Sequence, residues 1–280
     1  MALSTISLTS GMRANLFSLQ KTSLDMEVTQ KRLSTGLKVN SALDDPINFF
    51  TAQEHRMRAS DLASRKDGMS EAIQTIKAAN VGIEGINNLI AQAKSLAQSA
   101  LSAGSTDALA FGTQFGEVLT QINEMAEDSG YKGINLLQSG ELTVEFAPSA
   151  GDATLKLTGF GGTDTEFTTI DSSTVTSAGW VSNTDVSTSV IQSAIDGLET
   201  AMGDLRTESK KLSSNLSIIT AREDFTSNMT NTLKDGAAKL TEADMNEEGA
   251  NMLMLQTRQA LGTTSLSMAS QAAQSVLRLF

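Results

Sequence analysis

Apolar residues recur at steps of three and four positions in four stretches of the chain, the spacing that places side chains on one face of an α-helix. The stretches run from Leu8 to Leu37, Met69 to Leu101, Ile191 to Ile219 and Leu255 to Phe280. The third and fourth alternate the two steps strictly, which is typical of a coiled-coil seam. We therefore predict four long helices that pack through continuous apolar stripes.

The spacing also predicts which residues face inward in the first helix and in a further, shorter helix. The first stripe contains two polar positions, and its expected members are Leu8, Met12, Leu16, Leu19, Ser23, Met26, Gln30, Leu33 and Leu37. A shorter helix is predicted over about Ala108 to Ala126, with an inward face made of Leu109, Phe115, Leu119 and Ile122.

The expected helix boundaries carry the residues that end or begin helices. Gly36 follows the first stripe, in the position where a glycine commonly ends a helix. Asp45 and Pro46 have the pattern of an N-cap followed by proline in the first turn of the next helix. Asp107 is the expected cap of the short helix.

Residues 139–189 differ from the rest, because they are rich in Gly, Ser and Thr and lack helical spacing. Alternation at Leu142, Val144 and Phe146, and again from Ala153 to Leu157, predicts a β-hairpin. We divide the chain accordingly into terminal helices (1–44 and 236–280), a helical-bundle domain (45–138 and 190–235) and a short surface insert that contains the hairpin (139–189).

The apolar stripes near both ends of the chain need partners. An isolated amphipathic helix is marginal in water, since most of its stability comes from packing its apolar face. Pairing the two terminal stripes with each other still leaves apolar residues uncovered, among them Phe17, Leu24, Val28, Met252 and Met268. If the chain supplies no further cover, other copies must, although an ordinary bundle or dimer has similar ends.

Charge and composition exclude several classes of function. The net charge of −11 disfavours binding to nucleic acid or to anionic lipid. No apolar run approaches bilayer length, and the first twenty residues lack the apolar core of a cleaved signal peptide. Cysteine is absent, which excludes disulfides and Cys-ligated metals. Alone, these features indicate a cytosolic protein, unless a dedicated apparatus exports it.

We find no pattern of residues that indicates catalysis, a cofactor or a metal. His55 is the single histidine, so the chain cannot contain a His-Glu-x-x-His zinc motif, which needs two histidines. We also find no suitable histidine partner for a Ser-His-Asp catalytic triad. The carboxylate pairs Asp44-Asp45 and Glu247-Glu248 are explained by capping and solvation. Met252 and Met254 are typical either of core packing or of an adaptable binding surface.

Four segments resemble motifs of the bacterial flagellins. Gln30–Asp45 (QKRLSTGLKVNSALDD) resembles the N-terminal signature of that family, and Tyr131–Leu137 (YKGINLL) resembles its turn before the central region. Leu240–Glu248 (LTEADMNEE) is similar to the motif that opens the final helix, and Gln274–Phe280 (QSVLRLF) is similar to the usual ending. The resemblance covers about residues 1–138 and 190–280.

This resemblance implies a mainly α fold, in which the N- and C-terminal segments form a long antiparallel coiled-coil bundle with a small β-hairpin insert. It implies a non-enzymatic filament subunit for swimming, exported unfolded through the flagellar type III system without a cleaved signal peptide, and extracellular once assembled. The implied partners are other flagellin copies, an export chaperone at the C-terminal helix, and hook-associated junction and cap proteins, with no nucleic acid and no membrane insertion. The expected self-assembly residues are Leu16, Leu19, Leu33, Gly36, Asn40, Asp45, Leu255, Leu266, Ala273, Val276 and Phe280.

Two alternatives remain at this point. Asp44-Asp45-Pro46 is also common in the hook–filament junction protein, a relative with similar ends. An adhesin or a type III translocator would also be rich in coiled coil, but a translocator should carry a bilayer-length apolar segment.

Overall fold

The computed structural model describes residues 10–147, 153–160, 179–182 and 185–277, and they are mainly helical, as predicted. The helices are α1 (Ser10–Thr35), α2 (Pro46–Leu101), α3 (Ser105–Asp128), α4 (Thr188–Thr241) and α5 (Met245–Leu277). The strands are β1 (Glu141–Glu145), β2 (Thr154–Thr158), β3 (Val181–Ser182) and β4 (Asp185–Val186). Backbone contacts divide the chain into two compact units, one of Met1–Met57 with Thr232–Phe280 and one of Arg58–Asn231. We call these the terminal unit and the central unit.

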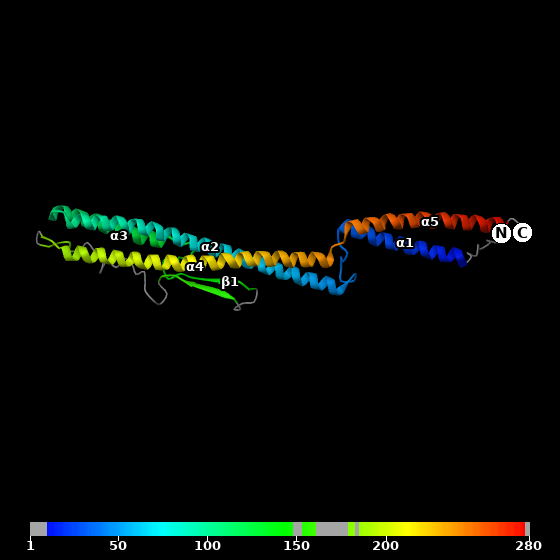
Figure 1. Ribbon diagram of the computed structural model, residues 1–280, viewed down its shortest axis with the longest axis horizontal. Helices are drawn as coiled ribbons and strands as arrows, with labels where there is room; N and C mark the ends of the chain where they lie inside the picture. The colour runs from blue at the N-terminus through cyan, green and yellow to red at the C-terminus, as the bar shows by residue number, and fades with distance from the viewer. Residues whose placement is uncertain (1–9, 148–152, 161–178, 183–184, 278–280) are drawn as a thin grey trace. The chain divides into compact units, whose positions relative to one another are not determined.

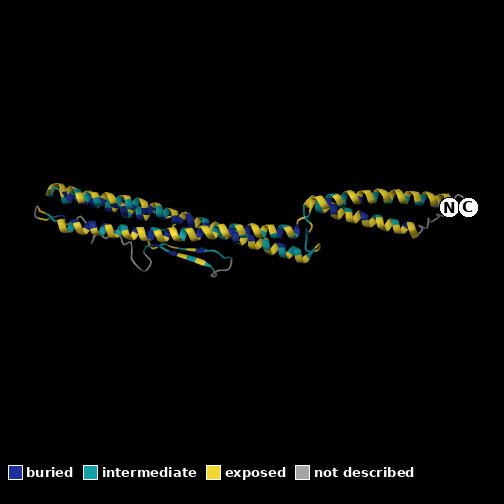
Figure 2. Cartoon of the chain, in the orientation of Figure 1, coloured by how far each residue is buried: buried dark blue, intermediate teal, exposed yellow. Residues whose placement is uncertain are grey.

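The core of the protein lies in the central unit, where α2, α3 and α4 contribute the buried side chains (Figures 1 and 2). The predicted stripe of α2 is confirmed, since Met69, Ile76, Ile86 and Ile90 are fully buried. The heptad seam of α4 is confirmed by buried residues from Ile191 to Ile219. Spacing alone was sufficient here, because both stripes face partners supplied by the same chain.

The predicted hairpin is present and packs on the central unit. β1 and β2 pair antiparallel, with Leu142 opposite Leu157 and Val144 opposite Leu155. Val144 and Leu157 are buried, and Arg65 of α2 pairs with Glu145 at the end of β1. Much of the predicted surface insert, including residues 148–152 and 161–178, lies outside the described residues.

The short helix differs from our prediction in two respects. α3 begins at Ser105, its N-cap position is Gly104, and Asp107 lies inside its first turn rather than capping it. Leu109 is 63% exposed, whereas the neighbouring Ala108 is fully buried. The predicted inward face was therefore displaced by one residue at its start. The small Ala108 permits close packing there, while Phe115 is buried as predicted and packs against Trp180, with ring centroids 4.8 Å apart.

In the terminal unit, α1 lies alongside α5 (Figure 1). The buried residues of α1 are Met12, Thr22 and Thr29, so the stripe predicted through Ser23 and Gln30 was wrong by one position in its middle. The Thr22 hydroxyl donates to the carbonyl of Ser18 at 2.9 Å. Because its hydroxyl is satisfied within the helix, threonine can occupy a buried position that we had expected an adjacent residue to fill.

Candidate assembly surface

Two turns of the chain are hydrogen-bonded to each other where α1 ends and α5 begins. Gly36 ends α1 with φ of +71°, a conformation that favours glycine, and its N–H donates to the Arg32 carbonyl at 2.8 Å. The Gly36 carbonyl accepts from Ala243 at 3.0 Å, and the Lys38 N–H donates to the Thr241 carbonyl at 2.7 Å. The predicted role of Gly36 at the helix end is confirmed, and its carbonyl also fixes the start of the last helix.

Polar side chains order the segment between α1 and α2. Asn40 donates from Nδ2 to Thr35 Oγ1 at 3.2 Å and to the Leu37 carbonyl at 3.3 Å. Asp44 Oδ2 accepts from the backbone N–H groups of Ser41 and Asn40 at 2.9 and 3.0 Å. These hydrogen bonds hold the pKa of Asp44 below its usual value, and the one from Ser41 has the largest effect.

The next residue, Asp45, caps α2 as predicted. Its Oδ1 accepts from the backbone N–H of Asn48 at 3.1 Å, and its Oδ2 accepts from Nδ2 of the same residue at 2.6 Å. α2 then begins at Pro46, which has no N–H to leave unpaired in the first turn.

An ion pair joins α1 to α5. Arg32 Nη1 lies 2.9 Å from Glu248 Oε1, and Glu248 is only 7% exposed. Its second oxygen, Oε2, is buried without a hydrogen-bond partner. The prediction that capping and solvation explain the pair Glu247-Glu248 is wrong for Glu248, because a charge buried in the first turn of α5 needs a cation and Arg32 supplies one.

The helices of the terminal unit approach closely at Gly262. A Cβ placed on Gly262 would lie 2.5 Å from Leu19 Cδ2, so the Leu19 side chain occupies space that glycine leaves free. Asn15 Nδ2 donates to the Gly262 carbonyl at 3.4 Å on the same side. Leu19 is therefore a residue of the α1–α5 contact.

The predicted assembly residues are only partly covered by this pairing. Leu255 is buried, Leu19, Leu33 and Leu266 are half-buried, and Leu16 is 40% exposed. Phe280 lies outside the described residues, as do the side chains of Ala273 and Val276.

Large exposed apolar side chains concentrate in the terminal unit. Among the described residues, thirteen of the seventeen belong to it, although it is the smaller unit. They come from α1, from the segment between α1 and α2, from the start of α2 and from α5, and they are Leu16, Phe17, Leu24, Val28, Leu43, Ile47, Phe50, Met57, Met245, Leu253, Met254, Leu261 and Met268. We call these thirteen residues the uncovered apolar surface. A large uncovered apolar area on a protein surface commonly marks an interaction site.

The uncovered residues of α5 beyond its first turn have few charged neighbours. From Gly249 to Leu277 the sequence contains one charged residue, Arg258. Figure 2 shows α5 mostly in the colour of exposed residues. A helix that faced water along this length would normally carry many charges on its outer side, so this composition indicates contact with other protein on several sides.

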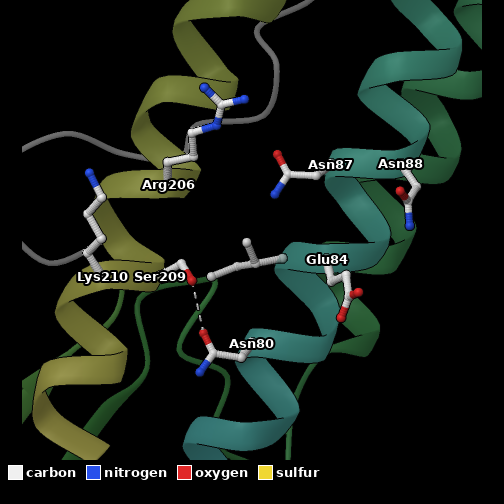
Figure 3. Close-up of a pocket in the computed structure, with 8 residues that line it drawn as sticks. Asn80, Glu84, Asn87, Asn88, Arg206, Ser209 and Lys210 are labelled. Atoms are coloured by element: carbon white, nitrogen blue, oxygen red, sulfur yellow. Dashed lines mark hydrogen bonds between the residues drawn. The ribbon is translucent and has the colours of Figure 1, made fainter.

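The central unit contains a hollow of about 530 Å³ between α2 and α4, but its lining does not form a catalytic site (Figure 3). Asn87 points from α2 toward α4, and its buried Oδ1 has no hydrogen-bond partner. Asn80 accepts from the Ser209 hydroxyl at 3.4 Å, while Arg206 and Lys210 lie on the α4 side. These amides and cations include no activated nucleophile.

No group of three or more His, Cys, Asp or Glu in the described part of the chain could hold a metal ion. None of the helices within the described ranges is both long and apolar enough to cross a membrane.

The fold is that of a mainly helical protein with an uncovered apolar surface, and comparison with known proteins gives its family. The model of the bacterial flagellin N-terminal helical region matches residues 4–141, and that of the C-terminal helical region matches residues 190–280. The chain belongs to the bacterial flagellin family. It is therefore a filament-forming structural protein and not an enzyme.

Two known flagellins are similar to this chain over nearly its whole length. Flagellin FljM of Caulobacter vibrioides is 28% identical over the whole of both chains, and a flagellin of Brucella melitensis is 28% identical over 95% of each. A crystal structure of Bacillus cereus flagellin aligns with 57% of this chain and 88% of its own, with a TM-score of 0.46 and 15% identity.

Proposed function

We propose that this chain polymerises through the uncovered apolar surface of its terminal unit, which would become the inner part of a flagellar filament that drives swimming. Membership of the flagellin family supports a filament subunit, and the distribution of exposed apolar residues supports the choice of surface. Fully burying a large apolar side chain contributes about 1.5–3 kcal/mol, so burying much of the exposed area of these thirteen residues in every subunit would hold a polymer together.

The single observation that carries this proposal is the exposed and almost uncharged length of α5 from Gly249 to Leu277. Pairing with α1 covers one side of α5, and the rest needs other copies. The predicted residues Leu255 and Leu266 would hold α1 and α5 together, while Leu16, which is 40% exposed, would contact neighbouring subunits. Ala273, Val276 and Phe280 stay predicted assembly residues. Gly36, Asn40 and Asp45 would fix the connection between α1 and α2.

A matched pair of substitutions tests the surface. Leu261 in α5 and Leu109 in α3 are 66% and 63% exposed, so an aspartate at either position should leave the monomer folded. We expect Leu261→Asp to abolish filament growth from purified monomer on filament seeds, because it buries an unpaired charge. Leu109→Asp should polymerise like the parent, as measured by sedimentation and electron microscopy. Normal filaments from Leu261→Asp would contradict the proposed surface.

We also propose that the flagellar type III apparatus exports the chain unfolded and that a chaperone covers α5 before export. The uncovered apolar residues of α5 support this, since an amphipathic or apolar helix commonly binds in a partner's groove. Junction and cap proteins of the hook would contact the same terminal helices. Expressed in a flagellated host, the chain should reach the medium only when the flagellar export gate is intact. A variant that lacks residues 255–280 should lose the chaperone.

A further inference from the structure

Methionine is the only sulfur-containing residue type in this chain, which has twelve methionines and no cysteine. The methionines differ widely in exposure. Met69 is fully buried in the central unit, and Met12 is 9% exposed at the α1–α5 contact. Met254 and Met268 of α5 are 46% and 60% exposed, so an oxidant in water reaches their sulfur atoms in the monomer.

Met254 and Met268 share one face of α5. They are fourteen positions apart with Leu261 midway, and steps of seven bring residues to nearly the same side of a helix. Leu261 is 66% exposed, and Arg258 supplies the only charge in this part of the helix. We call these three apolar residues the methionine stripe.

We propose that Met254 and Met268 are an oxidation site whose conversion to sulfoxides stops the subunit from joining a filament. This inference rests on the proposed function, in which the methionine stripe is buried by neighbouring copies. It assigns oxidation to two methionines whose side chains are largely exposed in the single chain.

The chemistry needs only a peroxide as oxidant. A sulfur lone pair attacks one peroxide oxygen, the O–O bond breaks, and an S–O bond forms. The sulfur loses two electrons, and the peroxide is reduced to water or an alcohol after proton transfer. A methionine sulfoxide reductase reverses the change, so the modification can act as a switch.

The sulfoxide opposes assembly because it is polar where the thioether is not. Its oxygen is a strong hydrogen-bond acceptor, and the three residues of the methionine stripe carry no side-chain donor. Of the hydroxyls one turn away, those of Thr257 and Thr264 already donate to the carbonyls of Leu253 and Ala260. Burying an acceptor without a partner is unfavourable, and two of them in each subunit should raise the critical concentration for polymerisation at least about tenfold. Within a completed filament the same sulfurs would be covered and protected.

The first experiment measures oxidation itself, without reference to assembly. Purified monomer is treated with hydrogen peroxide, and the mass increase of each methionine-containing peptide is followed by mass spectrometry. Met254 and Met268 should oxidise at least about tenfold faster than Met69. Equal rates for these three residues would overturn the inference that α5 presents an accessible site.

The second experiment uses two pairs of exposed methionines. A Met254→Leu/Met268→Leu variant removes the proposed site and keeps its apolar character. The control, Met57→Leu/Met245→Leu, removes two other methionines of the uncovered apolar surface, which are 56% and 49% exposed but, unlike the methionine stripe, adjoin charged residues such as Arg56 and Asp244. Each variant and the parent are seeded with and without peroxide pretreatment, and polymer is measured by sedimentation.

We expect peroxide to block the parent and the control variant, and to leave Met254→Leu/Met268→Leu assembling normally. Reduction of the oxidised parent by methionine sulfoxide reductase should restore assembly. A parent that polymerises fully with both methionines oxidised would overturn this inference and leave the proposed function standing. The same conclusion would follow if Met57→Leu/Met245→Leu still assembled after peroxide treatment. If untreated parent formed no filaments, the proposed function would be contradicted, and this inference would fall with it.

Discussion

Arg32 and Glu248 are 216 positions apart in the chain, yet their side chains form an ion pair of 2.9 Å between α1 and α5. The two residues differ in exposure, since the Arg32 side chain is 36% exposed and the Glu248 side chain only 9%. The pair therefore places a carboxylate inside the contact while the cation stays near water. Loss of the cation would leave a buried charge without compensation.

Removing Arg32 should weaken the α1–α5 contact. Breaking a buried pair from one side costs up to several kcal/mol, and we expect about 2–3 kcal/mol for Arg32→Gln because Arg32 is partly exposed. Arg32→Gln combined with Glu248→Gln should recover most of the loss. The measurement is the free energy of local opening of α1, obtained from amide hydrogen exchange. A double variant as unstable as the single one would show that the ion pair does not carry the contact.

A second prediction concerns the space that Gly262 leaves for Leu19. Gly262→Leu should destabilise the α1–α5 contact by about 1–3 kcal/mol, because the new side chain needs the volume that Leu19 occupies. Exchanging the sizes, with Leu19→Ala and Gly262→Leu together, should restore part of the stability. The stability of the single and the double variant is measured by amide hydrogen exchange of α1 and α5. Unchanged hydrogen exchange in Gly262→Leu would contradict the close approach of α1 and α5 at this position.

The central unit was predictable from the sequence to a greater extent than the terminal unit. The stripes of α2 and α4 bury their residues within one chain, so helical spacing directly predicts the core. In α1 a seam through Ser23 and a seam through Thr22 are nearly equivalent in spacing. Only the partner helix decides between them, and spacing contains no information on the partner.

The ion pair and the Gly262 contact were beyond prediction for a different reason. Each depends on the register between two helices at opposite ends of the sequence, which no local pattern specifies. Leu109 shows the same limit within one helix, since its large apolar side chain suggested burial but Ala108 faces the core instead. Caps are local, and so Gly36 and Asp45 could be assigned from their immediate neighbours.

The conformation of Gly36 leads to a third prediction. Its φ of +71° is unfavourable for residues with a Cβ, although no atom lies within 4 Å of the position that a Cβ would take. Gly36→Ala should therefore cost about 1–2 kcal/mol through backbone strain alone. The matched control is Gly249→Ala in α5, which has equal space and lacks a positive φ, so it should be neutral or stabilising. Exchange of the Ala243 amide, which donates to Gly36, measures the effect; equal effects of both variants would contradict it.

Acid should loosen the segment between α1 and α2 through Asp44. Its pKa is lowered from 3.8 by the backbone hydrogen bonds from Ser41 and Asn40. Because the folded pKa lies below the unfolded value, its stabilisation is full above pH 3.8 and is lost as the pH falls through the folded pKa. NMR titration of the Asp44 carboxyl should give a midpoint below 3.8, and the Ser41 amide should follow it. Asp44→Asn should remove this step, and a midpoint at or above the usual value would contradict the hydrogen-bonded geometry.

The last prediction concerns where a protease cuts the monomer. Every member of the buried core cluster lies in the central unit, between Met69 and Ile219, so the terminal helices should open at lower free energy. Trypsin offers sites in both units, since Lys21 of α1 and Arg258 of α5 are exposed, as are Lys77 of α2 and Arg206 of α4. Cleavage requires local unfolding rather than exposure alone, and we expect the terminal sites to be cut at least about tenfold faster. In assembled filaments the terminal sites should become resistant, because opening them would then also require loss of the contacts between subunits. The measurement is mass spectrometry of timed digests of monomer and filament. Equal cleavage rates at the four sites in the monomer would mean that the α1–α5 pair is as stable as the core without neighbouring copies, and terminal sites that stayed labile in filaments would mean that assembly leaves this surface uncovered.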